Sequence, residues 1–186
     1  MNEPGKLLAA PELAASDPPT SFSSFALAPK PPEAQPGMDW LPWVFFDVSC
    51  RACGSPDLRL GSFVEAVTDA SASPHAKPGE KLLRPPHRLK CEPCGATGTI
   101  FDARTDGYDG ILNDGGPYKS GATGERFSDV VCKIVVGATY NIDLTELEEL
   151  AAKAGAGVKA TDLFDWINII ATTDDGGRLE LDYECG

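Results

Sequence analysis

The sequence predicts an α+β fold, and three observations lead to that prediction. The motif C-x-x-C-G occurs twice, at residues 50–54 and 91–95, with strand-like sequence on either side of each copy. The C-terminal half contains an amphipathic stretch with good helix-capping residues, followed by two apolar segments around a turn rich in Asp and Gly. The chain has 186 residues, which suits one domain of ordinary size.

Residues 1–39 predict a flexible, disordered arm. This stretch contains eight prolines, separated mostly by small and polar residues. Such a composition buries too little apolar surface to offset the entropy lost on ordering. Segment 21–28 is the exception, because it carries Phe22, Phe25 and Leu27. An alternative is therefore that this segment packs along the folded body.

Ordered structure is expected from Trp40 onward, in a β lobe spanning residues 40–104. The aromatic run 40–46 predicts a strand that enters the first cysteine motif, and residues 58–67 predict a second strand after it. Residues 71–86 contain Pro, Ser, Gly and Lys without a period, which favours a loop. Residues 97–101 then predict a strand that leaves the second motif.

The C-terminal part, residues 125–186, predicts the order β-α-β-β. Residues 127–140 alternate well enough for one long strand. A helix is expected next, with Asp143 as its N-cap, Gly155 as its stop and a buried stripe made of Leu144, Leu147, Leu150, Ala151 and Ala154. Segments 167–171 and 179–183 predict a hairpin around the turn at 174–177. We expect this part and the β lobe to join into one domain, residues 40–186.

The cysteines of the two motifs are the candidate metal ligands: Cys50, Cys53, Cys91 and Cys94. Two residues between paired cysteines allow a tight turn to aim both sulfurs at one point, and the following glycine accepts a positive φ. Two such turns brought together supply four thiolates in a tetrahedron, the arrangement of Zn²⁺ in closed structural sites. We therefore expect one structural Zn²⁺, with Arg51, Arg88 and Lys90 placed to offset the negative charge.

This arrangement resembles the zinc-ribbon proteins, in which two C-x-x-C-G knuckles clamp one zinc ion and lead into short strands. The resemblance covers residues 44–102 and identifies no subfamily. Cys53 and Cys91 are separated by 37 residues, whereas compact four-cysteine sites have roughly 15–20. Many zinc ribbons belong to the transcription or translation machinery, so the resemblance implies nucleic-acid association as an alternative function. A local basic stretch agrees with that alternative: Lys77, Lys81, Arg84, Arg88 and Lys90.

Other chemistry stays open at the cysteines and beyond them. A rubredoxin-like iron site uses a similar local pattern, and a redox-active dithiol is a further alternative. His87 could replace one ligand. Acidic and amide side chains in a Gly-rich stretch form a candidate hard-cation site: Asp102, Asp106, Asp109, Asn113 and Asp114. Cys132 and Cys185 fall on expected strands as buried thiols, and whether they pair stays open.

Charge and missing motifs narrow the function classes. The formal net charge is −12, from 28 acidic and 16 basic side chains, and such a surface repels nucleic-acid phosphates. No catalytic motif is recognisable, so we expect a protein that is not an enzyme. With no apolar run long enough for a bilayer and no signal-peptide pattern, reduced thiols favour the cytoplasm. The predicted function is a structural zinc protein that binds another protein; its biological role, partner and oligomeric state stay open.

Overall fold

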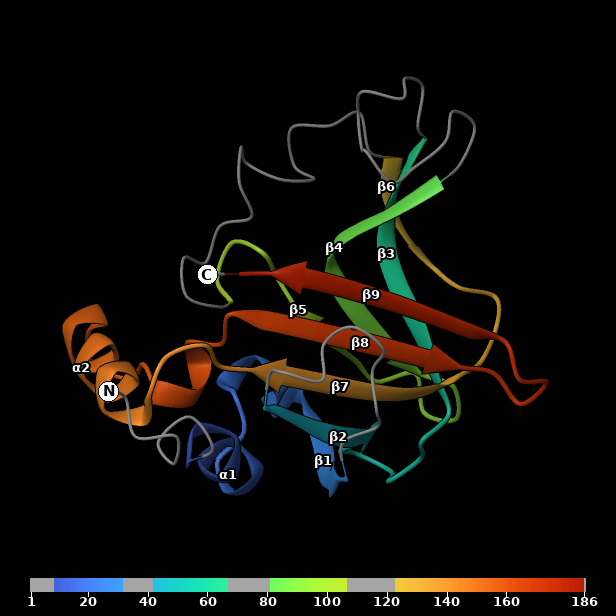
Figure 1. The fold of residues 1–186 in the computed structure, drawn as a ribbon. Helices are drawn as coiled ribbons and strands as arrows, with labels where there is room; N and C mark the ends of the chain where they lie inside the picture. Colours follow the sequence, from blue (N-terminus) through green and yellow to red (C-terminus); the bar gives the residue numbers. More distant parts are fainter. Residues whose placement is uncertain (1–8, 32–41, 67–80, 107–122, 186) are drawn as a thin grey trace.

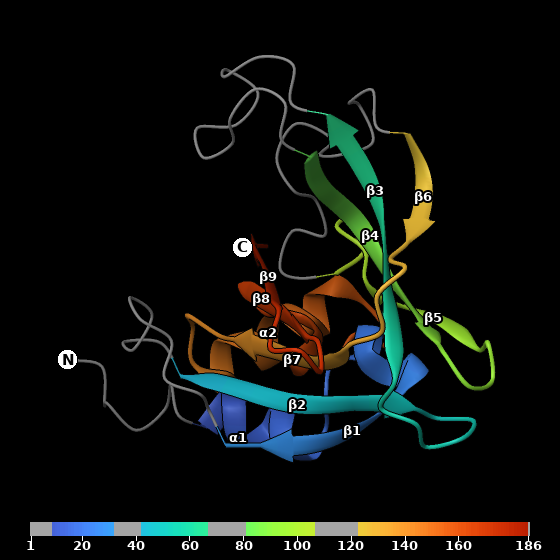
Figure 2. The same cartoon turned by 90° about the vertical axis from the view of Figure 1, so that its right-hand side faces the viewer.

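The computed structural model describes residues 9–31, 42–66, 81–106 and 123–185. These residues form two antiparallel sheets, here called sheet A and sheet B, and two α-helices. A mostly β protein with two helices agrees with the predicted α+β class. Sheet A runs across the molecule in Figure 1, and Figure 2 shows sheet B rising steeply from one end of it.

Sheet A has five strands, in the spatial order β1-β2-β7-β8-β9. Their bounds are Phe25–Lys30 (β1), Trp43–Cys50 (β2), Lys133–Thr139 (β7), Trp166–Thr172 (β8) and Arg178–Glu184 (β9). Sheet B has four strands, in the order β5-β4-β3-β6. Their bounds are Leu58–Ala66 (β3), Lys81–Cys91 (β4), Thr97–Phe101 (β5) and Thr123–Phe127 (β6).

The two sheets do not follow the division expected between residues 104 and 125. Strand β2, from the first part of the chain, pairs with β7 from the second part. Strand β6, which begins before residue 125, pairs with β3 in sheet B. Each sheet therefore contains strands from both sides of the expected division. The first cysteine motif lies where the chain passes from sheet A to sheet B.

Two expected elements differ from the structure. Residues 81–86, expected in a loop, belong to β4, and residues 81–84 of them pair with β3. Residues 71–80 lie outside the described residues. Of the single strand expected at 127–140, residues 133–139 form β7 in sheet A, and Phe127 is the last residue of β6 in sheet B. Between them the chain bonds back to β3, through Ser128 N to Leu60 O at 2.8 Å and a bridge between Cys132 and Leu58. This bridge links the first residue of β3, in sheet B, to the residue that precedes β7, in sheet A.

The flexible arm expected over residues 1–39 is wrong for residues 9–31. They form helix α1 (Ala9–Ser16), a 3-10 turn (Thr20–Ser24) and strand β1, which pairs along its length with β2. Phe22 is fully buried and lies 6.4 Å from Phe46 and 6.0 Å from Phe164, measured between ring centroids. These contacts with distant residues supply the burial that the segment's own composition lacks. The alternative, with 21–28 packed on the body, is confirmed.

Helix α2 (Leu144–Ala154) confirms the expected caps. The side chain of Asp143 accepts a hydrogen bond from Glu146 N at 3.1 Å, and Gly155 ends the helix with φ +120°. Only Leu147 and Ala151 of the expected stripe are buried, and Ala154 is exposed. The hairpin β8–β9 is also confirmed, with each strand slightly longer than expected.

Among the described residues, none of the helices has the length and apolar character to cross a bilayer.

Candidate metal centre

The four predicted ligands come together at one corner of the molecule. The sulfurs of Cys50, Cys53, Cys91 and Cys94 all lie within 4.8 Å of one another. Two of the separations are 3.6 Å, from Cys50 to Cys94, and 3.5 Å, from Cys53 to Cys91. Sulfurs at the corners of a tetrahedron with Zn–S bonds of about 2.3 Å would be about 3.8 Å apart. The spacing thus fits a metal ion in the centre.

The two motifs fold into the same local structure. In each motif the glycine N–H donates to the carbonyl of the first cysteine, Gly54 to Cys50 at 2.7 Å and Gly95 to Cys91 at 2.9 Å. In each motif, the N–H of the first cysteine donates to the carbonyl of the residue after the glycine, which closes the turn. Gly54 and Gly95 have φ of +75° and +73°, a region that side chains with a Cβ rarely adopt. The sequence pattern therefore dictates the backbone turn.

Each motif begins at the end of a strand. Cys50 is the last residue of β2 in sheet A, and Cys91 is the last residue of β4 in sheet B. The connections after them lie next to each other at the end of the molecule where the sheets meet (Figure 2). An ion held by all four sulfurs would therefore tie one sheet to the other.

The environment of the sulfurs affects their ionisation unequally. Cys50 and Cys91 are buried, whereas Cys53 and Cys94 are exposed. Burial raises the pKa of Cys50, but hydrogen bonds from the backbone N–H groups of Cys53 and Ala52 and from the side chains of Cys94 and Cys91 together lower it to about 7. Burial raises the pKa of Cys91. Four crowded thiols cannot all ionise by themselves, and a divalent cation is what would make four thiolates stable together.

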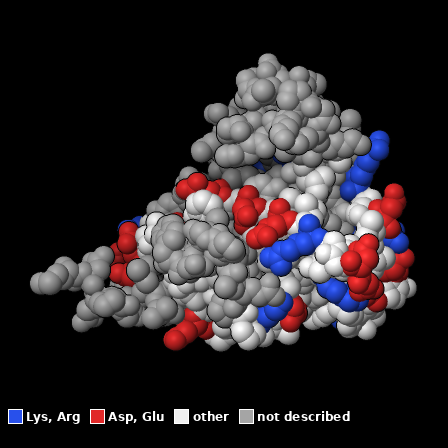
Figure 3. Space-filling view, turned by 45° about the vertical axis from the view of Figure 1, so that its right-hand side comes forward, with Lys and Arg blue, Asp and Glu red and all other residues white. Residues whose placement is uncertain are grey.

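Charged side chains brace the corner around the cysteines. Arg59 of β3 forms an ion pair with Glu92, inside the second motif, and also donates to the Ser128 carbonyl at 3.2 Å. Lys133 of β7 forms an ion pair with Asp57, between the first motif and β3. Acidic and basic side chains alternate over the described part of the face in Figure 3. Both ion pairs are partly exposed and contribute modestly.

Two of the three basic residues expected to offset the charge of the cluster donate to oxygen atoms nearby. Arg51 donates to the Phe25 carbonyl at 3.0 Å, and Arg88 donates to Thr97 Oγ1 at 3.3 Å. Of the other basic residues singled out in the sequence, Arg84 lies on β4, the side chain of Lys81 is not described, and Lys77 lies outside the described residues.

His87 does not belong to the cysteine cluster. It is fully buried, and its ring nitrogens bond Ser62 Oγ at 2.8 Å and the Tyr183 hydroxyl at 2.7 Å. The ligand-swap alternative for His87 is therefore wrong. The bonds connect β3 and β4 of sheet B to β9 of sheet A. No motif links these three residues, so the sequence offered no signal for this contact.

The remaining candidates are separate from the cysteines. Asp102 accepts from Arg104, and Asp106 accepts from Asp102 N at 2.7 Å; Asp109, Asn113 and Asp114 lie outside the described residues. Within the described ranges, the four cysteines are the one group of three or more potential ligands in metal-binding reach. Cys132 and Cys185 are both buried free thiols.

Comparison with protein-family models, with curated proteins and with solved structures finds no match for this chain. The arrangement of its own residues must therefore support any function assigned to it.

Proposed function

We propose that this is a structural zinc-binding protein that acts by binding another protein. The observation that carries the metal assignment is the cluster of four sulfurs within 4.8 Å of one another. Four cysteines fill a tetrahedral shell and leave no position open for a reacting water, which favours a structural ion over a catalytic one.

The ion would act as a cross-link between the sheets. The two motifs are far apart in sequence but hold the ends of β2 and β4 at the same corner. The two strands belong to different sheets. Binding of a structural ion contributes its free energy directly to folding. Since thiolates must stay reduced to hold the ion, we propose a reducing compartment such as the cytoplasm.

Binding of another protein is favoured over binding of nucleic acid by charge. Residues 141–186 alone carry 11 acidic and 3 basic side chains. Strand β9, at the edge of sheet A, presents Glu180, Asp182 and Glu184 as exposed side chains. Phosphates would be repelled by this surface, whereas basic or polar protein surfaces would not.

Metal analysis tests the first half of the proposal. We expect one zinc per chain in protein purified without added metal, and none in Cys53→Ser or Cys94→Ser. Cys132→Ala, which removes a free thiol outside the cluster, is the control and should keep the ion. A red protein containing iron, or wild-type protein without any transition metal, would contradict the zinc assignment.

Affinity capture tests the second half. Zinc-loaded wild type and Cys132→Ala should retain the same protein from a cell extract, and chelated protein should lose it. A nuclease-sensitive retention that falls steeply with salt would instead indicate nucleic acid.

A further inference from the structure

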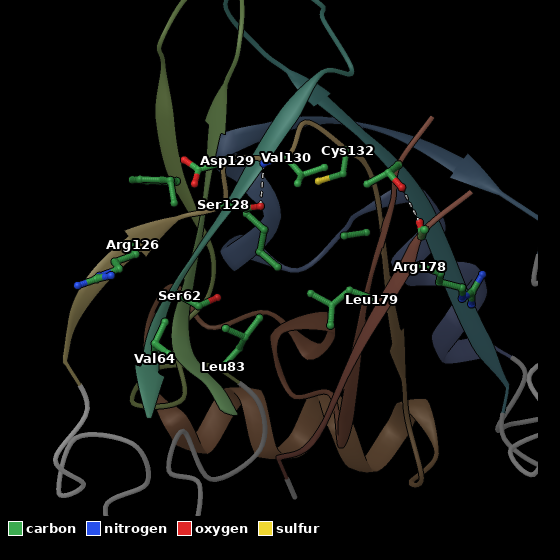
Figure 4. A pocket seen from close by; sticks show the side chains of 15 residues that line it. Ser62, Val64, Leu83, Arg126, Ser128, Asp129, Val130, Cys132, Arg178 and Leu179 are labelled. Atoms are coloured by element: carbon green, nitrogen blue, oxygen red, sulfur yellow. Dashed lines mark hydrogen bonds between the residues drawn. The ribbon is translucent and has the colours of Figure 1, made fainter. Parts of the chain in front are cut away.

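A groove with a volume of about 650 Å³ lies between the two sheets, and none of the four clustered cysteines lines it. One wall comes from sheet B and the other from sheet A. Most of its lining is apolar, chiefly Leu60, Val64, Leu83, Phe127, Ala171 and Leu179. Figure 4 shows Leu83 of β4 and Leu179 of β9 pointing toward each other across the hollow. Its volume is within the ~300–1,000 Å³ of ordinary small-molecule sites.

The large apolar side chains that stay exposed in the described residues lie in this groove. Among the described residues, the large apolar side chains that remain exposed are Val130, at 54%, and Leu179, at 40%. Both line this groove. A ligand in the groove would remove their surface from water, which is favourable in proportion to the apolar area covered.

One polar side chain in the wall is held in a fixed orientation. Ser62 lines the groove and is 2% exposed, and its hydroxyl bonds His87 Nδ1. At the other side of the ring, the Tyr183 hydroxyl donates to the Leu83 carbonyl at 3.2 Å. That hydroxyl also lies 2.7 Å from His87 Nε2. In either tautomer of the ring, the Ser62 oxygen uses at most one of its two lone pairs on His87 Nδ1. At least one lone pair of the Ser62 oxygen therefore stays free to accept a hydrogen bond from the groove.

The strands are irregular where these residues lie. The pairing of β3 with β4 shifts between Gly61 and Phe63, and its pairing with β6 shifts between Ser62 and Val64. The pairing of β4 with β5 shifts between His87 and Arg88. Such irregularities re-aim side chains and are frequent beside binding sites.

The serine–histidine pair does not favour hydrolysis. Burial lowers the pKa of His87 to about 4, so the ring is a poor acceptor for the serine proton. Its second nitrogen faces the neutral phenol of Tyr183, which cannot stabilise an imidazolium as a carboxylate does. The hydroxyl is therefore suited to recognising a ligand.

We propose that the groove between the sheets binds a neutral, apolar small molecule with a single hydrogen-bond donor, which the Ser62 oxygen accepts. Neutrality follows from the charged residues of the lining, Arg126, Asp129 and Arg178, which lie at the edge of the hollow in Figure 4. Arg178 also pairs with Glu180. The proposal is independent of the metal and of the protein partner proposed above.

The first experiment measures whether the groove is a site. The probe is N-phenyl-1-naphthylamine, a neutral fluorophore with one N–H donor that brightens in apolar surroundings. We expect saturable binding to the full chain, weakened at least tenfold by Leu179→Arg. Glu184→Arg, also a change to arginine on β9 but at a residue outside the groove lining, should stay within twofold.

Failure of wild-type protein to bind the probe saturably, or equal weakening by both variants, overturns the proposal. If Leu179→Arg does not fold, Val130→Glu replaces it, since that residue is more exposed and lines the same groove.

The second experiment measures the role of Ser62 with two isomeric competitors. 1-Decanol has a hydroxyl donor, and methyl nonyl ether has the same atoms without one. Displacement of the probe should be about five- to tenfold more effective with the alcohol, which is the usual effect of one hydrogen bond. In Ser62→Ala the two should agree within twofold. Equal displacement in wild-type protein, or an unchanged preference in Ser62→Ala, overturns the assignment of the donor to Ser62.

Discussion

The two sheets are joined at two places that differ in how the sequence encodes them. At the cysteine corner, β2 and β4 end in two copies of one short motif. Further along, Ser62 and His87 of sheet B reach Tyr183 of sheet A through a chain of hydrogen bonds. The cysteine corner is partly exposed and would be held together by a metal ion. The hydrogen-bonded junction is buried and is held together by its own side chains.

Two contacts that both join the sheets can thus differ in whether the sequence alone predicts them. A metal-binding motif requires fixed spacing and a glycine at a positive φ, so it can be recognised within five residues. A buried hydrogen-bond chain requires only that donors and acceptors meet after folding. Ser62, His87 and Tyr183 come from three strands and share no pattern.

The largest effect should follow from breaking the cysteine corner. Cys53→Ser and Cys94→Ser should each lower the free energy of unfolding by an amount on the order of 10 kcal/mol, the contribution of a structural zinc ion. The two exposed cysteines should be equivalent, because each supplies one of four thiolates. Hydrogen exchange at 50–58 and 91–97, with thermal unfolding, measures the loss. Full protection in either variant would show that the corner holds without the ion.

The hydrogen-bonded junction should instead respond to pH. Burial lowers the pKa of His87 from 6.5 to about 4. As pH falls through this interval, the unfolded chain takes up a proton that the folded chain refuses, so stability is lost and then levels off below pH 4. The loss should be about 3 kcal/mol for a shift of this size.

His87→Gln isolates this contribution, because an amide can bond both neighbours without titrating. The variant should be less stable than wild type at neutral pH, and the difference should narrow as pH falls toward 4. Loss of metal in acid affects both proteins alike and cancels in the comparison. Parallel stability curves for the two proteins would show that His87 is not responsible.

The same contrast explains which parts of the fold could be predicted. Each cysteine turn, the capped helix α2 and the hairpin β8–β9 depend on residues close in sequence, and all were predicted. The meeting of the two cysteine turns was predicted because the same motif occurs twice. The order of residues 9–31 depends on pairing between β1 and β2 and on the contacts of Phe22 with Phe46 and Phe164. The proline-rich composition gives no sign of these partners, of which β2 and Phe46 follow closely in sequence and Phe164 lies more than a hundred residues away.

A smaller effect is expected from Tyr183→Phe. The change keeps the ring, which lies 5.1 Å from Phe101 between centroids. It removes a hydroxyl that forms a hydrogen bond with His87 Nε2 and donates to the Leu83 carbonyl. The fully buried His87 ring then loses one hydrogen-bond partner, at a cost of about 2 kcal/mol. Tyr140→Phe is the control, because its buried hydroxyl makes one bond, to the Thr161 carbonyl at 2.9 Å. Urea unfolding should show the larger loss for Tyr183→Phe; equal losses would mean that this junction is not a special link between the sheets.

The smallest effect should come from Gly95→Ala, and it returns the comparison to the cysteine corner. A methyl group at Gly95 would meet no atom within 4 Å, so the strain is confined to a backbone with φ +73°. The cost should be about 1 kcal/mol. Gly176→Ala, in the β8–β9 turn with φ +86° and equally open space, is a matched control. Both should lower the unfolding free energy of metal-free protein similarly, while only Gly95→Ala should weaken zinc in competition with a chelator. If both leave zinc affinity unchanged, the positive φ serves the turn alone and the sulfurs position themselves without it.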